Sequence, residues 1–160
     1  MIKPKSLRDL LASALPELAR DPDRMLVFID SGSVVSTLAP GRSFEYRYTL
    51  NLIITDYAGH PDAVMVPLLD WIRINQSELL ANDKRRGEIA FEVDVLANDK
   101  VDIDIKLPLT ERVGVHAGAD GVLTIEHYPE PAIEQPFPPR HWKLFLKDEL
   151  LAEWDAPAGG

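Results

Sequence analysis

The sequence contains no cysteine among its 160 residues. This absence excludes disulfide bonds, thiolate nucleophiles and cysteine-ligated zinc sites. A chain of this length buries enough apolar surface to fold as one ordinary domain without covalent links. The stability of the fold must therefore come from noncovalent packing, and the pattern of hydrophobic residues along the chain indicates which side chains pack.

Long hydrophobic runs are missing too. No stretch approaches the roughly 20 apolar residues that a membrane-spanning helix needs. Two lysines lie among the first six residues, but no apolar run of the signal-peptide type follows them. These features predict a chain that folds in the cytoplasm and has no membrane partner.

Positive charge is scarce in this chain. Lys and Arg number 17 against 26 Asp and Glu, so the net charge is −9 and the pI is near 4.8. Nucleic-acid affinity comes mostly from basic side chains that release counterions from phosphates, so a specific nucleic-acid ligand is not expected. DNA can still pass nearby, because a wall of like charge does not adhere to it.

Residue combinations that carry catalysis are missing as well. His60, His116, His127 and His141 are scattered, with no pair at metal-ligand spacing, and no serine lies in a nucleophile elbow. The glycines are isolated, as in bulges and turns, and form no phosphate-binding loop. The sequence therefore predicts no catalytic residue, no cofactor and no metal ion, and it gives no reason to expect an enzyme.

The strongest pattern that is present lies in residues 43–57, SFEYRYTLNLIITDY. Apolar side chains occupy every second position from Phe44 to Ile54, and polar side chains alternate with them up to Asn51. Period two predicts a strand with one face in a core and the other in water. The strand would extend for roughly 40 Å, about twice the usual length. We expect it to form the centre of an antiparallel sheet.

Two helices are expected to pack on one face of that sheet. Ser6 should cap the first, an amphipathic helix that Pro16 kinks or breaks near Leu15. The second should begin near Asp62 and continue to about residue 75 or 80, with Pro67 as either an early kink or the first helical residue. Each helix carries an apolar stripe that needs a sheet face to cover it.

Shorter strands complete the predicted α+β fold, which is mainly antiparallel sheet. Residues 25–30 and 34–38 flank a Ser-Gly-Ser segment that predicts a bulge or a bend, and residues 39–41 predict the turn into the long strand. A further strand is expected at 122–128.

Residues 88–113 predict a hairpin with an acidic outer face. Matching apolar with apolar side chains gives a three-residue loop, with Val95 opposite Ile103 and Asp94 opposite Asp104. Three interpretations of this face remain open: a solvated surface that prevents aggregation, a contact face for a basic partner, and a weak calcium site. The acidic face comprises Glu92, Asp94, Asp102 and Asp104.

The composition changes after residue 128, where five prolines follow within eleven residues. Residues 129–140 should form an extended, polyproline-like arm that leads to a C-terminal β-hairpin. A lone hairpin is marginal in water, so it either folds back on its own domain or docks on a neighbour. We therefore divide the chain into an α+β core, residues 1–128, and an arm with a hairpin, residues 129–160. The hairpin residues expected to anchor a partner are Trp142, Leu144, Phe145, Leu146, Leu150 and Trp154.

Several segments, taken together and in order, resemble the tail completion protein R family of contractile-tailed temperate phages. The matching segments are IKPKSLR at 2–8, FIDSGSVVSTL at 28–38, the run at 43–57, VPLLDWIR at 66–73 with Asn75 and Gln76, LPLTER at 107–112 and LLAEWD at 150–155. The resemblance spans nearly the whole chain. It rests on the number and order of the segments, since none of them is a chemical signature.

The resemblance implies a structural role in the virion. Proteins of this family act late in tail assembly and are similar to tail terminators, which form a ring, commonly a hexamer, at the head-proximal end of the tail tube. Such a ring would end polymerisation and present the surface for the neck. Its partners would be further copies of the chain, tube and sheath proteins, and a neck or connector protein. The residues alone leave an alternative, a monomeric adaptor module that binds a peptide along a sheet edge.

Overall fold

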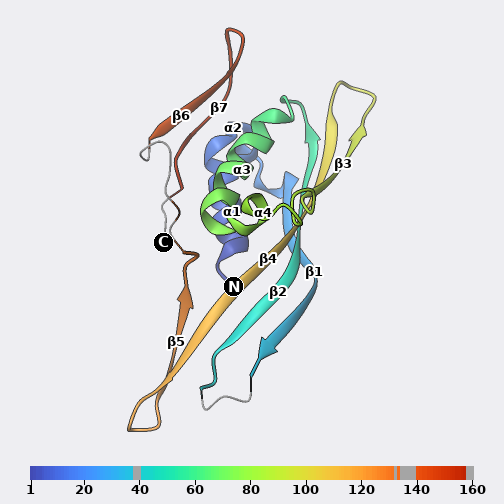
Figure 1. The fold of residues 1–160 in the computed structure, drawn as a ribbon. Coiled ribbons are helices and arrows are strands. Elements are labelled where there is room, and N and C mark those ends of the chain that lie inside the picture. Colours follow the sequence, from blue (N-terminus) through green and yellow to red (C-terminus); the bar gives the residue numbers. More distant parts are fainter. Residues whose placement is uncertain (38–40, 132, 134–139, 158–160) are drawn as a thin grey trace.

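A five-stranded antiparallel sheet forms the centre of the computed structural model, which describes residues 1–37, 41–131, 133 and 140–157 (Figure 1). Four strands follow one another across the sheet, and the fifth pairs with the far end of β4. In spatial order the strands are β1 (Met25–Ser36), β2 (Phe44–Tyr57), β4 (Val101–Ala117) and β3 (Ala90–Val95), with β5 (Leu123–Tyr128) beside β4. The expected α+β fold is confirmed.

The helices cover one face of this sheet, and a separate two-stranded sheet lies beside them (Figure 1). The helical elements are α1 (Lys3–Ala14), α2 (Pro16–Arg20), the short 3-10 turn η1 (Pro22–Arg24), α3 (Asp62–Asn75) and α4 (Glu78–Ala81). The second sheet consists of β6 (His141–Leu146) and β7 (Glu149–Asp155). In the described part of the chain, no helix is both long enough and apolar enough to cross a membrane.

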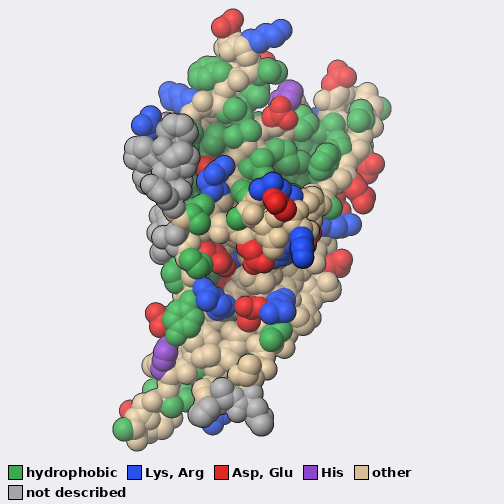
Figure 2. All heavy atoms as spheres, viewed as in Figure 1, with side chains coloured by type: hydrophobic (Ala, Val, Ile, Leu, Met, Phe, Trp, Pro, Cys, Tyr) green, Lys and Arg blue, Asp and Glu red, His purple; other side chains and the backbone are tan. Residues whose placement is uncertain are grey.

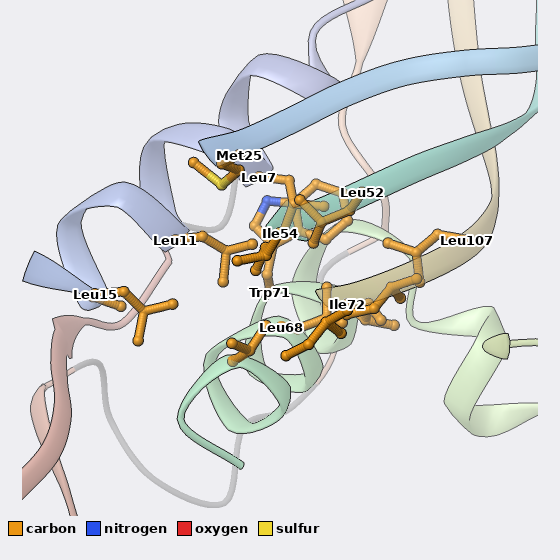
Figure 3. Packing of buried hydrophobic residues seen from close by; sticks show 14 of the residues in the cluster. Leu7, Leu11, Leu15, Met25, Leu52, Ile54, Leu68, Trp71, Ile72 and Leu107 are labelled. Carbon is orange, nitrogen blue, oxygen red and sulfur yellow. The ribbon is translucent and has the colours of Figure 1, made fainter. Parts of the chain in front are cut away.

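The central strand expected from period two is confirmed. β2 extends over 14 residues and pairs with β1 on one side and β4 on the other. Its alternate side chains Leu50, Leu52 and Ile54 are fully buried. Figure 3 shows Leu52 and Ile54 meeting the side chains of α1 and α3, where Trp71 is among the largest buried side chains. Packing of the two helices on one apolar sheet face thus forms the core.

The first helix begins earlier than expected. α1 starts at Lys3, so Ser6 lies inside it, and the Ser6 Oγ accepts a hydrogen bond from the Trp71 indole N–H at 3.0 Å. The prediction of Ser6 as the cap was wrong because a carboxylate from β4, that of Glu111, accepts the Ile2 N–H instead. The break at Leu15 is confirmed, since its backbone is extended and α2 begins at the next residue.

The second helix settles the two interpretations of Pro67. α3 begins at Asp62, as expected, and contains Pro67 in its interior. Pro67 as the first helical residue was therefore wrong. The helix ends at Asn75, at the nearer of the two predicted limits, and α4 follows as a separate turn.

The β3–β4 hairpin has a different register from the predicted one. Val95 lies opposite Val101 and Asp94 opposite Asp102, a shift of two residues. The Leu96 N–H donates to the Lys100 carbonyl at 2.8 Å, so the three-residue loop is 97–99, and Asp99 takes the left-handed conformation there (φ 55°). A shift of two residues preserves which side chains share a face, so the acidic face remains.

The bulge in β1 lies next to its predicted position. Ile29 pairs with Leu50 and Ser31 with Thr49, so Asp30 is the extra residue, one position before the Ser-Gly-Ser segment. The strand then continues to Ser36. The predicted turn at 39–41 lies mostly outside the described residues, as does most of the predicted arm, at positions 132 and 134–139.

Candidate interaction surfaces

The C-terminal hairpin packs on the helices of its own chain. Ala152 and Trp154 of β7 are buried in the same apolar cluster as Leu11 and Trp71. The Trp154 indole N–H also donates to Asp70 Oδ2 on α3 at 3.1 Å. Of the two locations left open by the sequence, the structure has the hairpin on its own domain.

This packing divides the six side chains that were expected to anchor a partner. Trp154 is only 5 % exposed, and Trp142 and Leu144 are half-buried against the core. The exposed ones lie nearer the hairpin tip: Phe145, Leu146 and Leu150. Only these three are available to a partner without unpacking the domain, and whether they bind one stays a prediction.

The division of the chain into a core, residues 1–128, and an arm with a hairpin, residues 129–160, likewise stays a prediction.

The three exposed hairpin side chains belong to a wider apolar surface. Figure 2 shows hydrophobic side chains gathered over α3, between the β6–β7 hairpin and the β3–β4 hairpin. We call this surface the hairpin face; its exposed members are Val66, Leu69, Phe91, Val95, Phe145, Leu146 and Leu150. Exposed apolar patches drawn from several elements mark interaction sites in soluble proteins.

A second apolar surface lies at the other end of the molecule, where the sheet extends beyond the helices (Figure 1). Val34 pairs with Tyr46 and Val115 with Ile125, so side chains of β1, β2, β4 and β5 share one face there. Val34 is 61 % exposed and Ile125 is 70 % exposed. We call it the sheet-end face; its members are Val34, Phe44, Tyr46, Val115, Leu123 and Ile125.

Sequence reasoning did not single out the sheet-end face. The alternation of apolar residues at 113 and 115, and again at 123 and 125, was visible as strand pattern. Nothing local shows that the helices stop short of these residues, because helix placement depends on contacts distant in sequence. The missed surface is therefore a tertiary feature.

The boundary between the covered and uncovered parts of the sheet holds a buried carboxylate, Glu111. Its Oε2 accepts the Ile2 N–H at 2.7 Å and lies 3.4 Å from His127 Nδ1, while Oε1 accepts a hydrogen bond from the Tyr48 hydroxyl. Burial, together with the hydrogen bond to Glu111, raises the pKa of Tyr48. A negative charge at the first turn of α1 also complements the helix dipole. Glu111 thus fastens the helix start to β4.

Lys3 and Gln76 extend this network to the arm. The Lys3 ammonium donates to Gln76 Oε1 at 2.9 Å and to Glu130 at 2.7 Å, and burial lowers the pKa of Lys3. Gln76 Oε1 also accepts the Thr110 N–H at 3.0 Å. Thr110 lies where β4 has lost β3 as a neighbour and not yet gained β5. The Gln76 side-chain amide therefore accepts the hydrogen bond that a neighbouring strand would otherwise accept from Thr110.

The acidic residues lie on the sheet face turned away from the helices. Ile103 and Ile105 are buried toward the helices, so the intervening carboxylates point the other way. The pairs across the two strands are Glu92 with Asp104 and Asp94 with Asp102. Within the described residues, no three His, Asp or Glu side chains are placed so that they could hold a metal ion.

A polar groove of about 690 Å³ hollows the protein beside the β1 bulge. Its charged side chains are mostly paired: Arg47 bonds Glu45 at 2.5 Å, and Arg85 bonds both Glu78 and Glu88. The groove lining is thus satisfied internally and has no net excess of positive charge.

Comparison with known proteins places the chain in a family. Residues 1–131 match the family model described as P2 phage tail completion protein R (GpR). The chain is 40 % identical over 156 residues to tail completion protein R of Escherichia phage P2, covering 97 % of this chain and 99 % of that protein. No solved structure matches. The chain therefore belongs to the P2 phage tail completion protein R family and has a structural role in completing a phage tail.

Proposed function

We propose that this protein forms a ring at the head-proximal end of a phage tail, ends polymerisation of the tube and sheath, and presents the surface that joins the neck. In this proposal its place in the virion is the neck end of the tail, reached after assembly in the host cytoplasm. Family membership supports the tail role, because the relative from phage P2 is similar over nearly its whole length.

The positions of the two apolar faces support a role between two assemblies. The hairpin face and the sheet-end face lie at opposite ends of an elongated molecule (Figure 1). A protein that lies between two different assemblies needs two separate contact surfaces, one for each. Two apolar faces at the two ends meet that need, whereas a monomeric adaptor that binds a peptide on a sheet edge needs neither.

We assign the hairpin face to the tail and the sheet-end face to the neck. Ending polymerisation requires a permanent contact, and permanent interfaces are the more hydrophobic ones. The hairpin face gathers exposed aliphatic and aromatic side chains from α3, β3 and the C-terminal hairpin. The sheet-end face is more polar at its margin, since His127 and Glu111, on the same side of the sheet, lie 3.4 Å apart there.

The acidic face has a place in the same ring. The helices cover one side of the sheet, and Glu92, Asp94, Asp102 and Asp104 lie on the other. We propose that this other side faces the lumen. Carboxylates there would repel the phosphates of passing DNA and keep the genome from adhering to the ring.

A complementation assay with one variant for each face tests the proposal. In lysates that lack the wild-type protein, Leu69→Glu should leave tails uncapped and of irregular length, because a charge on the hairpin face blocks tail binding. Val115→Glu, on the interior strand β4 of the sheet-end face, should give tails of normal length that do not join heads. Lys84→Glu, on an exposed loop outside both faces, is the control and should behave as wild type. Wild-type behaviour of both face variants would contradict the proposal.

A further inference from the structure

We propose that neighbouring copies of this chain join edge to edge in the ring, with β1 of one copy pairing to β5 of the next. This inference rests on the proposed ring and supplies its lateral contact. The occupant of each free edge is thus a second copy of the same chain. In the described part of the chain, no strand pairs with β1 opposite β2 or with β5 opposite β4.

The edge strands β1 and β5 carry neither lysine nor proline, two of the residues that keep strands apart. Proteins protect free edges with lysine, proline or inward charge, because unpaired backbone groups recruit other strands. β1 contains no Lys, Arg or Pro in its 12 residues, and Val34 and Val35 are exposed. β5 contains none either, and Leu123 and Ile125 are exposed. Both strands are therefore ready to accept a partner strand.

The other free edges of the protein are protected in the usual way. β3 carries Glu92 and Asp94 within its six residues. β6 carries Lys143 and His141, each within reach of a β7 carboxylate. β5 also carries one carboxylate, Glu126, which lies 3.3 Å from His116 on β4. Residues 31–36 of β1, beyond the bulge at Asp30, carry no charged side chain. The contrast with β3 and β6 is therefore strongest for β1.

The free edges of β1 and β5 face opposite sides of the same part of the sheet. Ser36 pairs with Phe44, Phe44 with Val113, and Val113 with His127, so one row of residues crosses all four strands. Residues 31–36 of β1 and all six residues of β5 border this sheet end. The two edges are staggered, because residues 31–36 lie level with β4 residues 108–113 and β5 lies level with residues 112–117. Pairing of Val34 with Ile125 therefore requires neighbouring copies to be displaced by four residues along the strands. A closed ring of strands takes up such a stagger by tilting the strands relative to its axis.

Strand direction also fits edge-to-edge joining. β1 is antiparallel to β2, β2 to β4, and β4 to β5, so the two edge strands of this four-stranded sheet end run in opposite directions. Copies placed side by side in the same orientation therefore bring β1 and β5 together as antiparallel neighbours. Repeating one such contact between two different edges is the heterologous arrangement that closes into a ring.

The side chains agree with this pairing. Val34 on β1 and Ile125 on β5 lie on the same face of the sheet, the one that the helices cover further along. Joining the edges would place these exposed residues on neighbouring strands. Cross-strand pairs of β-branched side chains stabilise a sheet. The sheet-end faces of successive copies would form one continuous apolar band around the ring.

Cysteine pairs test the contact cleanly, because the chain has no cysteine of its own. Val34→Cys and Ile125→Cys are made as separate single variants, mixed with uncapped tail tubes, and treated with a short bismaleimide reagent. We expect covalent dimers of this chain only when the two variants are mixed. Val34→Cys paired with Val95→Cys, on the protected β3 edge, is the matched control and should give no dimer.

The possible results distinguish a failure of the β1–β5 contact from a failure of the proposed function. Dimers from Val34→Cys alone would mean symmetric β1–β1 pairing, and cross-links to tube protein instead of to this chain would mean a foreign strand; each overturns the proposal. End rings in the microscope without any Val34–Ile125 product would also overturn the edge contact while leaving the proposed function intact. Tube ends that stay bare would count against the proposed function itself.

Discussion

The indole N–H of Trp154 donates a hydrogen bond to Asp70 Oδ2 at 3.1 Å and ties the C-terminal hairpin to α3. The two residues lie 84 positions apart in the sequence. Because Trp154 and Ala152 are buried in the core, removal of residues 129–160 would test folding before it tested any docking role. Point variants on the exposed tip separate the two.

Substitution of Trp154 should unfold the protein more easily. Trp154→Ala empties a buried site and should lower the free energy of unfolding by about 3–5 kcal/mol. Trp154→Phe retains an aromatic ring and loses the bond to Asp70, so about 1 kcal/mol is expected. Urea unfolding measures both. The control Phe145→Ala, at an exposed position, should stay within about 0.5 kcal/mol. A wild-type midpoint for Trp154→Ala would show that the hairpin adds nothing to the core.

Gln76 should be intolerant of an apolar replacement. Gln76→Leu leaves the Thr110 N–H without its acceptor and the Lys3 ammonium with Glu130 alone, and an unsatisfied buried group costs about 1–3 kcal/mol. We expect a loss of at least about 2 kcal/mol in chemical unfolding. Glu78→Ala, which removes only an exposed ion pair with Arg85, should change stability by less than about 1 kcal/mol. Equal effects of the two variants would refute the strand-replacement role of Gln76.

Stability should fall in strong alkali. Burial, with a smaller contribution from Glu17, raises the pKa of Tyr57 from 10.0 to about 12. Between these values the unfolded chain has lost the phenol proton while the folded protein keeps it, so folding stability decreases as pH rises from 10 toward 12. Unfolding midpoints across this range should decline, and Tyr57→Phe should decline less steeply. Identical slopes for the two proteins would contradict the assignment to Tyr57.

Neutralising the acidic face should slow passage of the genome. The triple variant Asp94→Asn, Asp102→Asn and Asp104→Asn keeps side-chain shape, including the acceptor that Asp102 offers to the Asp56 N–H. We expect normal head joining and a lower rate of DNA delivery in infection assays. Asp83→Asn with Asp120→Asn, two exposed carboxylates elsewhere, is the control. An unchanged rate of DNA delivery in the triple variant would contradict the proposal that the acidic face lines the lumen of the ring.

The local features of the fold were predictable because local physics decides them. Period two located β2, and the missing backbone donor of Pro16 located the break at Leu15. The β3–β4 register was missed by two residues because both registers keep the same faces. The turn distinguishes them, through the left-handed Asp99 and the hydrogen bond from the Leu96 N–H to the Lys100 carbonyl.

The features that the sequence did not predict depend on contacts between distant segments. Glu111 caps α1 from 109 residues away, so a nearby serine looked like the natural cap. Trp154 is buried because β7 packs against α1 and α3, a contact that no local pattern describes. The same holds for the sheet-end face, which exists because the helices end before the sheet does.

Negative-stain microscopy of uncapped tail tubes, with and without the purified protein, shows whether the chain forms a ring that ends the tail. We expect ring-shaped density at one end of each tube only, together with arrested elongation. Bare ends and continued growth in the presence of the protein would contradict the proposed function.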